Sequence, residues 1–531
     1  MSEERWDEGL GGLLDSVTDP AAEVIHDGRR IPVPVLASES RRVARGLLDL
    51  GVQPGDRVGL WLPNVPEWLA LFFACARVGA IAVAVNTRFR SKEVGDIVGG
   101  AGCRVLAFQP GFKGIDFAGI LEDVAPAALE GLEHLVVCGS GDTDATGLPN
   151  GGRDVRPTSW RSLAGSPELG EDTGGPDDPC LIFITSGTTS SPKFVLHRQS
   201  AIAGHARVAA RAHGYDADDA RLLQMLPLCG AFGHAQALAT LAAGRPMVLQ
   251  TAFDAGEAVA LCQRHRVSNF NASDEMVARM LEATDAERPL PDLRFCGYAR
   301  FSGIAGLVEA AAARGVHLRG LFGMSETQAL LAMQPEADPR RYSLGGGVLV
   351  SEHSRVRVRD PGTGELQPHG ETGEIELRGP SLMLGYYRNP EGSRQAFTED
   401  GYLRTGDLGY TTADGGFVFT GRIKDVLRLG GFLVAPAEIE AYLEQHPTVY
   451  ACAAVEGANA HPRRAVAFVV SADGETADEA ELFAFCRRGL ARFKVPARIF
   501  LLDEMPAVPS PNGAKIRRNL LRQWADEWTR E

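Results

Sequence analysis

The sequence predicts an α/β protein with a large N-terminal portion followed by a small, mobile α+β C-terminal domain. In the large portion, a strand at 57–62, a helix at 65–78 and a buried apolar strand at 80–85 form a βαβ unit. Repetition of such units predicts two doubly wound α/β lobes. Alternating residues at 355–377 predict a small antiparallel β subdomain.

Further elements follow in chain order. Ser38 is placed to cap a helix that Gly51 would end. Residues 139–179 are rich in Gly, Asp, Ser and Pro, which predicts a surface linker between two lobes. An alanine-rich helix is expected at 302–314, and an apolar turn at 320–326.

The C-terminal part continues the α/β pattern. The expected helices and strands span 437–445, 466–470, 479–490 and 499–502. About a hundred residues can fold alone, so we predict two domains. They are an N-terminal domain at 1–423 and a mobile domain at 424–531.

Composition describes a folded, acidic chain. Its 531 residues are 44% hydrophobic and 23% charged, as in globular proteins. A net charge of −14 argues against nucleic-acid binding by counterion release. The N-terminus lacks an apolar core, and the most apolar stretch contains Arg77 and Gly79, so neither a signal peptide nor a membrane span is expected. Nine dispersed cysteines without a Cys-x-x-Cys pair predict reduced thiols in a cytoplasmic protein.

One segment is typical of phosphate binding. An apolar strand at 181–184 runs into Thr185-Ser186-Gly187-Thr188-Thr189 and then Lys193. Hydroxyl and backbone N–H groups can surround phosphate oxygens, and the lysine can neutralise them. The segment is not a Walker P-loop, because the second glycine is absent and Phe194 follows the lysine. A purely structural loop is the alternative for such a turn taken alone.

Further motifs follow in a fixed order, and together they resemble the adenylate-forming superfamily. That superfamily includes acyl- and aryl-CoA synthetases, luciferases and the adenylation domains of peptide synthetases. The motifs are 185–193, Phe322-Gly323-Met324-Ser325-Glu326-Thr327, Gly385-Tyr386-Tyr387, 402–409, 421–425, 430–440 and 512–518. The resemblance covers essentially the whole chain.

The resemblance implies a nucleotide site. Its phosphate loop would consist of Thr185, Ser186, Gly187, Thr188, Thr189 and Lys193. Around the adenine and the rest of the nucleotide would lie Gly297, Tyr298, Ala299, Phe322, Gly323, Met324 and Ser325. Asp407 would accept hydrogen bonds from both ribose hydroxyls, and Arg422 would reach the ribose or phosphates.

The resemblance also implies catalytic and hinge residues. Lys515, with Thr185 and Glu326, would act in catalysis, since an ammonium group stabilises the charge that builds up on the α-phosphate. Glu326 would hold Mg²⁺. Lys424 would be the hinge about which the small domain rotates between two half-reactions.

Each of these residues has a simpler alternative explanation. Asp407 could be a turn aspartate and Glu326 a first-turn helix carboxylate. Lys515 could belong to a solvated basic face, and Arg422 and Lys424 could be ordinary surface charges. The order of the motifs favours the functional interpretation of each.

Several positions depart from the family pattern. The loop reads Ser190-Ser191-Pro192-Lys193-Phe194 instead of Gly-x-Pro-Lys-Gly, which should stiffen it. Gly230 stands where acyl-CoA synthetases commonly place histidine or an aromatic residue. Tyr298 replaces a glycine, so its phenol ring is expected to shorten the acyl tunnel. One residue, Ala514, separates Gly513 from Lys515.

The expected substrate is a small or aromatic acid, in a pocket lined by Gly230, Phe232, Gln236 and Tyr298. The leading hypothesis is ATP-dependent ligation of this acid to coenzyme A, with ATP, Mg²⁺ and coenzyme A as cofactors. The alternatives are transfer to an amine or a carrier-protein thiol, and activation of a small inorganic acid such as nitrite. A nucleotide-binding protein that has lost catalysis is a further alternative. No nucleic-acid or membrane partner is expected, and a homodimer is considered.

Overall fold

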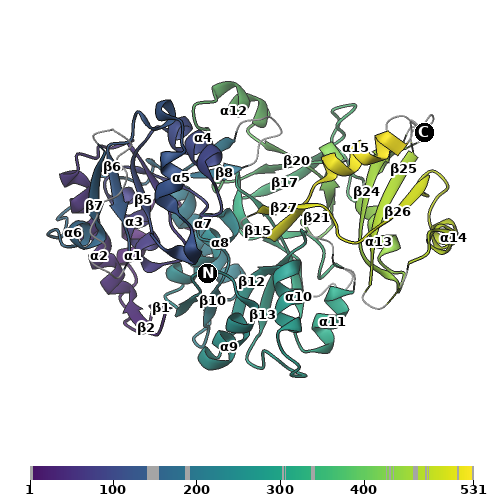
Figure 1. The fold of residues 1–531 in the computed structure, drawn as a ribbon, viewed down its shortest axis with the longest axis horizontal. Coiled ribbons are helices and arrows are strands. Elements are labelled where there is room, and N and C mark those ends of the chain that lie inside the picture. Colours follow the sequence, from purple (N-terminus) through teal and green to yellow (C-terminus); the bar gives the residue numbers. More distant parts are fainter. Residues whose placement is uncertain are drawn as a thin grey trace.

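Two large sheets and a smaller C-terminal unit make up the computed structural model of the chain (Figure 1). The structure describes residues 4–139, 155–185, 192–301, 304, 306–336, 341–425, 427–429, 432–434, 436–457, 464–472, 475, 477–510 and 513–528. The mixed α/β architecture with a separate C-terminal part confirms the predicted fold class.

The first lobe is built on an eight-stranded sheet of order β19-β9-β8-β4-β3-β5-β6-β7. Its strands are β3 (Arg57–Trp61), β4 (Ile81–Ala84), β5 (Cys103–Phe108), β6 (His134–Val137), β7 (Arg156–Ser159), β8 (Pro179–Thr185), β9 (Lys193–Arg198) and β19 (Gly385–Tyr386). Helices and short turns of this lobe are α2 (Val33–Asp49), α3 (Pro66–Arg77), α4 (Ser91–Ala101), η1 (Phe112–Gly114), α5 (Phe117–Glu122), η2 (Pro126–Leu129) and α6 (Trp160–Ala164). Strands β3 to β8 pair in parallel, whereas β9 and β19 run antiparallel at one edge.

The second lobe contains a run of parallel strands in the order β14-β13-β12-β10-β11-β1. These strands and the edge strand β2 are β1 (Glu23–His26), β2 (Arg29–Pro32), β10 (Leu222–Gln224), β11 (Met247–Leu249), β12 (Asn269–Ser273), β13 (Phe295–Ala299) and β14 (Leu318–Met324). The accompanying helices are α1 (Leu10–Asp15), α7 (Gln199–Ala212), α8 (Ala231–Ala242), α9 (Ala255–His265), α10 (Asp274–Glu282) and α11 (Leu307–Ala313).

The sheet of the second lobe continues through antiparallel strands into the small β subdomain. This part contains β15 (Gln328–Met333), β16 (Gly346–Leu349), β17 (Arg355–Arg359), β18 (Gly373–Arg378), α12 (Pro390–Ala396), β20 (Leu403–Thr411) and β21 (Phe417–Arg422). The expected hairpin at 355–377 is thus confirmed as β17 paired with β18.

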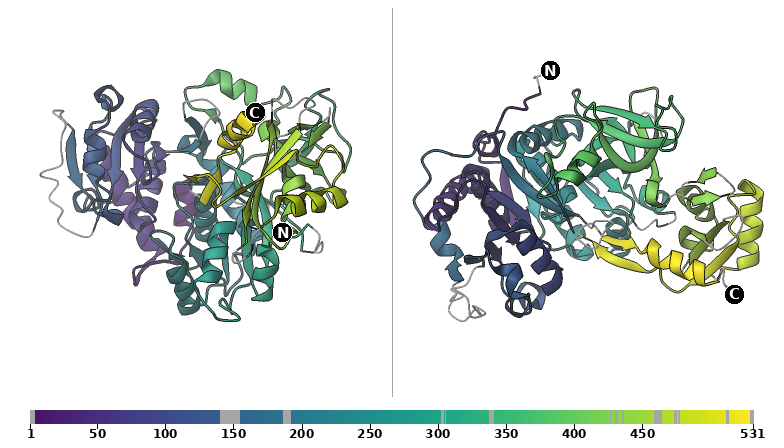
Figure 2. Two further views of the ribbon diagram at one scale, coloured as in Figure 1. Left: turned by 45° about the vertical axis from the view of Figure 1, so that its right-hand side comes forward. Right: turned by 90° about the horizontal axis from the view of Figure 1, so that it is seen from above.

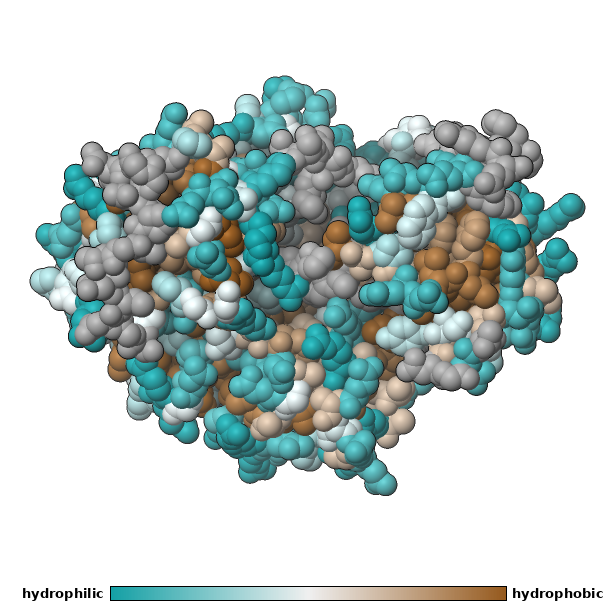
Figure 3. All heavy atoms as spheres, in the orientation of Figure 1, coloured by the Kyte–Doolittle hydropathy of each residue, from teal (hydrophilic) through white to brown (hydrophobic). Residues whose placement is uncertain are grey.

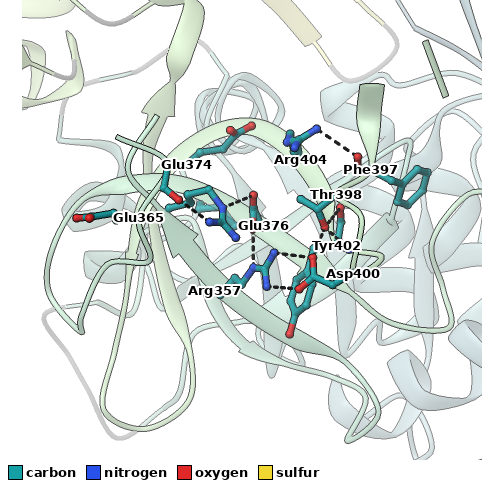
Figure 4. A network of polar contacts seen from close by, with 12 residues as sticks. Arg357, Glu365, Glu374, Glu376, Phe397, Thr398, Asp400, Tyr402 and Arg404 are labelled. Atoms are coloured by element: carbon teal, nitrogen blue, oxygen red, sulfur yellow. Dashed lines mark hydrogen bonds and ion pairs between the residues drawn. The ribbon is translucent and has the colours of Figure 1, made fainter. Parts of the chain in front are cut away.

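A buried carboxylate network ties the strands of this subdomain together (Figure 4). Glu376 is 0% exposed and accepts hydrogen bonds from Arg357 and Arg359, at 2.5 and 3.0 Å. Arg357 also pairs with Asp400, and its guanidinium lies 3.8 Å from the ring centroid of Tyr402. The network therefore connects β17 and β18 to the segment that precedes β20.

The C-terminal unit has its own core around a three-stranded sheet of order β24-β25-β26. Its elements are η3 (Ile423–Asp425), β22 (Leu427–Leu429), β23 (Phe432–Val434), α13 (Pro436–Leu443), β24 (Val449–Gly457), β25 (Arg464–Ser471), α14 (Glu479–Gly489), β26 (Arg498–Leu502), β27 (Ala507–Ser510), β28 (Gly513–Ile516) and α15 (Arg518–Trp528). Figure 2 shows this unit beside the second lobe, with the β27–β28 hairpin reaching toward it. Figure 3 shows apolar side chains gathered over the sheet of this unit.

Three local predictions were wrong. Ser38 does not cap a helix, because α2 already begins at Val33, next to the favourable Pro34. The segment 139–179 is not a linker between lobes: β7 and α6 fall within it, and β8 returns to the same sheet beside β4. The expected apolar turn at 320–326 is mostly strand β14, and the turn itself begins at Ser325.

All nine cysteines are unpaired, as expected, and all but Cys229 are buried. Among the helices that the structure describes, none has the length and apolarity needed to cross a bilayer.

Candidate active site

The two ends of the predicted phosphate loop face each other on a β-hairpin. Thr185 is the last residue of β8, Lys193 is the first residue of β9, and the two are Cα partners in the antiparallel pair. The remaining predicted loop residues, Ser186, Gly187, Thr188 and Thr189, lie with Ser190 and Ser191 outside the described residues. Thr185 thus stands at the carboxyl end of a sheet strand, the usual ligand-binding edge of an open α/β sheet.

Phe194, which replaces a glycine of the family pattern, is used for packing. Its ring packs against the buried cluster of the first lobe and lies so close to Gly100 of α4 that a Cβ on that glycine would come within 2.8 Å of it. The departure at Phe194 therefore joins the start of β9 to α4.

A chain of contacts connects Lys193 to Glu326 through Tyr386. The ammonium nitrogen of Lys193 lies 4.6 Å from the ring centroid of Tyr386, a cation–π arrangement. The Tyr386 hydroxyl donates a 2.9 Å hydrogen bond to Oε1 of Glu326. Burial and the Glu326 carboxylate raise the pKa of Tyr386, so the phenol stays protonated and is the donor. Only the Gly385-Tyr386-Tyr387 motif gave a sequence signal for this contact.

Glu326 is only 8% exposed, and its two carboxylate oxygens differ in their contacts. Oε1 accepts from Tyr386, and Oε2 has no hydrogen-bond partner among the described residues. That part of the chain also contains no group of three or more His, Cys, Asp or Glu side chains that could hold a metal alone. This donor set fits Mg²⁺, which commonly binds one or two carboxylates together with substrate phosphates.

The segment around Glu326 is a tight turn between β14 and β15. Phe322, Gly323 and Met324 end β14, and Ser325 and Glu326 form the turn. A Cβ on Gly323 would lie 2.4 Å from the Cα of Ala329, so the two strands can approach only because this residue is glycine.

The carboxyl ends of β13 and β14 are neighbours in the sheet next to this turn. Gly297, Tyr298 and Ala299 end β13, where Tyr298 pairs with Gly320 of β14. The Phe322 ring meets Phe417 edge-on at 5.0 Å between centroids. The predicted adenine-binding residues of β13 and β14 are therefore on adjacent strands of one sheet.

Asp407 and Arg422 are brought together directly. They are Cα partners on β20 and β21, and Nε of Arg422 lies 3.3 Å from Oδ1 of Asp407. Asp407 is 4% exposed, whereas the Arg422 side chain is 54% exposed. A fixed carboxylate beside an accessible guanidinium suits recognition of hydroxyl and phosphate oxygens.

The predicted acid-pocket residues lie on two elements. Gly230 is the N-cap residue of α8, Phe232 and Gln236 are buried in that helix, and Tyr298 is buried on β13. Gln236 donates both amide N–H bonds internally, to Leu223 O at 2.8 Å and Gln224 Oε1 at 2.9 Å. It therefore joins α8 to β10 and has no N–H left for a bound acid.

The predicted catalytic lysine lies in the hairpin of the C-terminal unit. Lys515 is in β28, which packs beside α10 of the second lobe, and Lys424 is in η3 between β21 and β22. Arg518, just after β28, makes a partly buried bidentate ion pair with Glu440 of α13, at 2.6 and 3.0 Å. This pair anchors the hairpin to the core of the C-terminal unit.

A different ion pair connects the N-terminal portion to the C-terminal unit. Arg300, just after β13, bonds to Glu444, just after α13. Burial raises the pKa of Glu444 to about 7, against the opposing effect of Arg300. The other oxygen of Glu444, Oε1, is buried without a partner among the described residues.

Comparisons with known proteins give a consistent result. Residues 17–387 match the model of the AMP-binding enzyme family, and residues 438–511 match the AMP-binding enzyme C-terminal domain. Sulfoacetate–CoA ligase of Cupriavidus necator is 32% identical over 495 residues, which cover 92% of each chain.

Two solved structures share the whole fold. ATP-bound MatB from Rhodopseudomonas palustris matches with a TM-score of 0.84 and 26% identity, covering 98% of this chain and 99% of MatB. The amide bond synthetase McbA from Marinactinospora thermotolerans matches with a TM-score of 0.81 and 27% identity, covering 97% and 99%.

Proposed function

The chain belongs to the family of AMP-binding enzymes, and on that premise we propose that it is an AMP-forming acid–CoA ligase. The observations that carry the site assignment are the contact chain from Lys193 through Tyr386 to Glu326 and the Asp407–Arg422 pair. It supplies a cation for phosphate, a carboxylate for a metal ion and a carboxylate for ribose. These are the groups that binding and activation of ATP require.

In the first half-reaction, a carboxylate oxygen of the acid attacks the α-phosphorus of ATP, and the bond to the pyrophosphate oxygen breaks. Thr185 and Lys193 bind the phosphates, Asp407 and Arg422 bind the ribose side, and Lys515 stabilises the charge on the α-phosphate oxygens. A bound Mg²⁺, held by Glu326, would neutralise phosphate charge. In the second half-reaction, the thiol of coenzyme A attacks the acyl carbon, and AMP leaves.

We place the domain boundary between residues 423 and 424, in η3, with Lys424 as the hinge. The position of β28 beside α10 supports the arrangement for the first half-reaction, because it brings the strand of Lys515 to the second lobe. The ATP-bound MatB structure, with its TM-score of 0.84, supports the same arrangement.

The acid is proposed to be small or aromatic. Tyr298 supports this choice, because its buried ring ends β13 in the predicted pocket. Nitrite stays an alternative as a small inorganic acid. A cytoplasmic location is part of the same proposal, supported by nine unpaired cysteines. Homodimer formation stays a prediction.

A second candidate has an amine or a carrier-protein thiol as acceptor. The likeness to an amide bond synthetase, over 97% of this chain, favours the amine. Quantifying AMP and product with coenzyme A, an amine or a carrier protein supplied separately distinguishes the acceptors. Acid-dependent product formation only with coenzyme A supports the ligase, whereas unchanged turnover without coenzyme A contradicts it.

A further inference from the structure

Three buried histidines of the second lobe and its neighbouring strand contact the segment that carries Glu326. His197 of β9 lies with Nε2 2.7 Å from Ser325 O. On α7, His205 Nε2 lies 2.7 Å from Ala329 O, and at its C-terminal end His213 Nε2 lies 3.4 Å from Leu330 O. The spacing of eight residues thus places three ring nitrogens along one backbone segment.

The direction of these hydrogen bonds follows from their partners. A backbone carbonyl only accepts, so each Nε2 must carry the proton and donate it. Burial lowers the pKa of His197 and of His205 to about 4, so both rings are neutral at physiological pH. Their Nδ1 atoms are buried without partners, so the Nε2 bond is the polar contact that the ring of His197 makes among the described residues.

The segment held in this way is strained. Gln328 and Leu330 adopt φ values of 62° and 64°, in the left-handed region that non-glycine residues seldom occupy. Such a conformation persists only where surrounding contacts determine it. The Gln328 side chain adds a further contact, to Ala201 O of α7 at 3.0 Å.

His197 also lies between two parts of the proposed ATP site, which are Lys193 and the segment that carries Glu326. It lies four residues after Lys193 on β9, and its partner carbonyl belongs to the residue just before Glu326. On the other side, Met383 N–H donates to Glu326 O at 2.8 Å. One strand therefore determines where both the phosphate-binding cation and the metal-binding carboxylate are placed.

We propose that His197 is a positioning residue for Mg²⁺-dependent ATP binding. By donating to Ser325 O, it fixes the backbone immediately before Glu326 and hence the direction of that carboxylate. The inference rests on the proposed function, because it assumes that Glu326 is a ligand of the Mg²⁺ bound with ATP. It predicts that loss of the His197 donor weakens the contribution of Mg²⁺ to ATP affinity without weakening metal-free ATP binding.

The chain offers a matched control in His234 of α8. This ring is also buried, burial lowers its pKa to about 3, and its Nε2 has no partner in the part of the chain that the structure describes. Both rings touch Phe183 edge-on, with centroids 5.8 Å away for His197 and 5.3 Å away for His234. His234 makes no hydrogen bond to the Glu326 segment, so its replacement tests packing alone.

The test compares His197→Gln, which keeps an N–H donor, with His197→Met, which has a similar size and no donor. Calorimetric titration of ATP, without any acid, measures affinity in excess MgCl₂ and in EDTA, so no turnover contributes. We expect His197→Met to lower the Mg²⁺-dependent gain in affinity about 5- to 10-fold, as for one lost hydrogen bond. His197→Gln should recover most of it, and His234→Met should resemble the wild type.

The outcomes distinguish failure of the proposed metal ligand from failure of the positioning role of His197. Glu326→Gln should lose the Mg²⁺ gain; if it keeps the gain, the metal assignment in the proposed function fails. If Glu326→Gln loses the gain but His197→Met keeps it, only the positioning role of His197 fails. Should His197→Met not fold, His197→Asn takes its place, because its shorter amide cannot reach Ser325 O. A wild-type Mg²⁺ gain in that variant contradicts the proposal equally.

Discussion

The ammonium nitrogen of Lys193 lies 4.6 Å from the ring centroid of Tyr386, so the lysine that we propose binds phosphate rests on an aromatic face. In the proposed function, Lys193 turns from this ring toward the phosphates of ATP. A cation–π contact contributes about 0.5–1 kcal/mol at an accessible site, so its removal should tighten metal-free ATP binding about 2- to 5-fold. We expect this gain for Tyr386→Leu and not for Tyr386→Phe, measured by calorimetry in EDTA. Equal ATP affinities of the two variants would show that the lysine does not leave the ring.

Asp407 should contribute to ATP affinity through the ribose. Replacement by alanine is expected to weaken ATP binding by about 1.5–3 kcal/mol, the range for hydrogen bonds to a charged group. The comparison ligand is 2′-deoxy-ATP, which lacks one ribose hydroxyl, so the variant should lose less affinity for it. Equal losses for both nucleotides would remove Asp407 from the ribose site.

The domain-crossing pair of Arg300 and Glu444 predicts a pH dependence. Burial raises the pKa of Glu444 from 4.5 to about 7, and the neighbouring carboxylates of Glu440 and Asp274 act in the same direction. A raised folded-state pKa means that the folded protein binds a proton more tightly than the unfolded chain. Stability from this group is therefore full below about pH 4.5 and is lost as the pH rises to about 7.

The measurement is the difference in thermal midpoint between the wild type and Glu444→Gln across this pH range. The wild type should lose stability relative to the variant as the pH rises. A constant difference, or a difference of opposite sign, would show that Glu444 titrates normally.

In the buried network around Glu376, removal of the arginines should destabilise the protein more than removal of the carboxylate. The double change of Arg357 and Arg359 to methionine leaves a fully buried carboxylate unpaired, which should cost about 3–5 kcal/mol of unfolding free energy. Glu376→Met should cost less, because Arg357 keeps Asp400 as partner and both arginines reach solvent. Denaturant unfolding of both variants checks this order, and the reverse order would contradict it.

Lys515 should act in the first half-reaction alone. Lys515→Ala is expected to abolish most adenylate formation and to spare thioester formation from supplied acyl-AMP, because only adenylation builds charge on the α-phosphate oxygens. Quenched-flow assays of the two half-reactions measure both rates. An equal loss in both would contradict the proposed rotation of the C-terminal domain.

Local sequence patterns predicted those elements whose structure depends mainly on their own residues. The helix expected at 65–78 is α3 (Pro66–Arg77), because its proline sits in the first turn and apolar residues run through it. The segment 139–179 could not be predicted in this way. Its β7 strand is polar, and only pairing with β6, decided by the sheet, makes it a strand.

The candidate site likewise combines residues that local motifs predict with a contact that no local motif predicts. Motifs predicted Thr185, Lys193, Glu326 and Asp407 as site residues, since each motif keeps its residues close in the chain. The contact of His197 with Ser325 joins residues 128 positions apart, and the carbonyl acceptor fixes the tautomer. No local pattern contains that information.

The most direct test of the account is ATP–pyrophosphate exchange over a panel of acids, with MgCl₂ and without coenzyme A. It reports the first half-reaction whatever the acceptor. We predict exchange that requires a small or aromatic acid and that is lost in Lys515→Ala. Absence of exchange with every acid, or release of ADP instead of AMP, would contradict adenylate formation at this site.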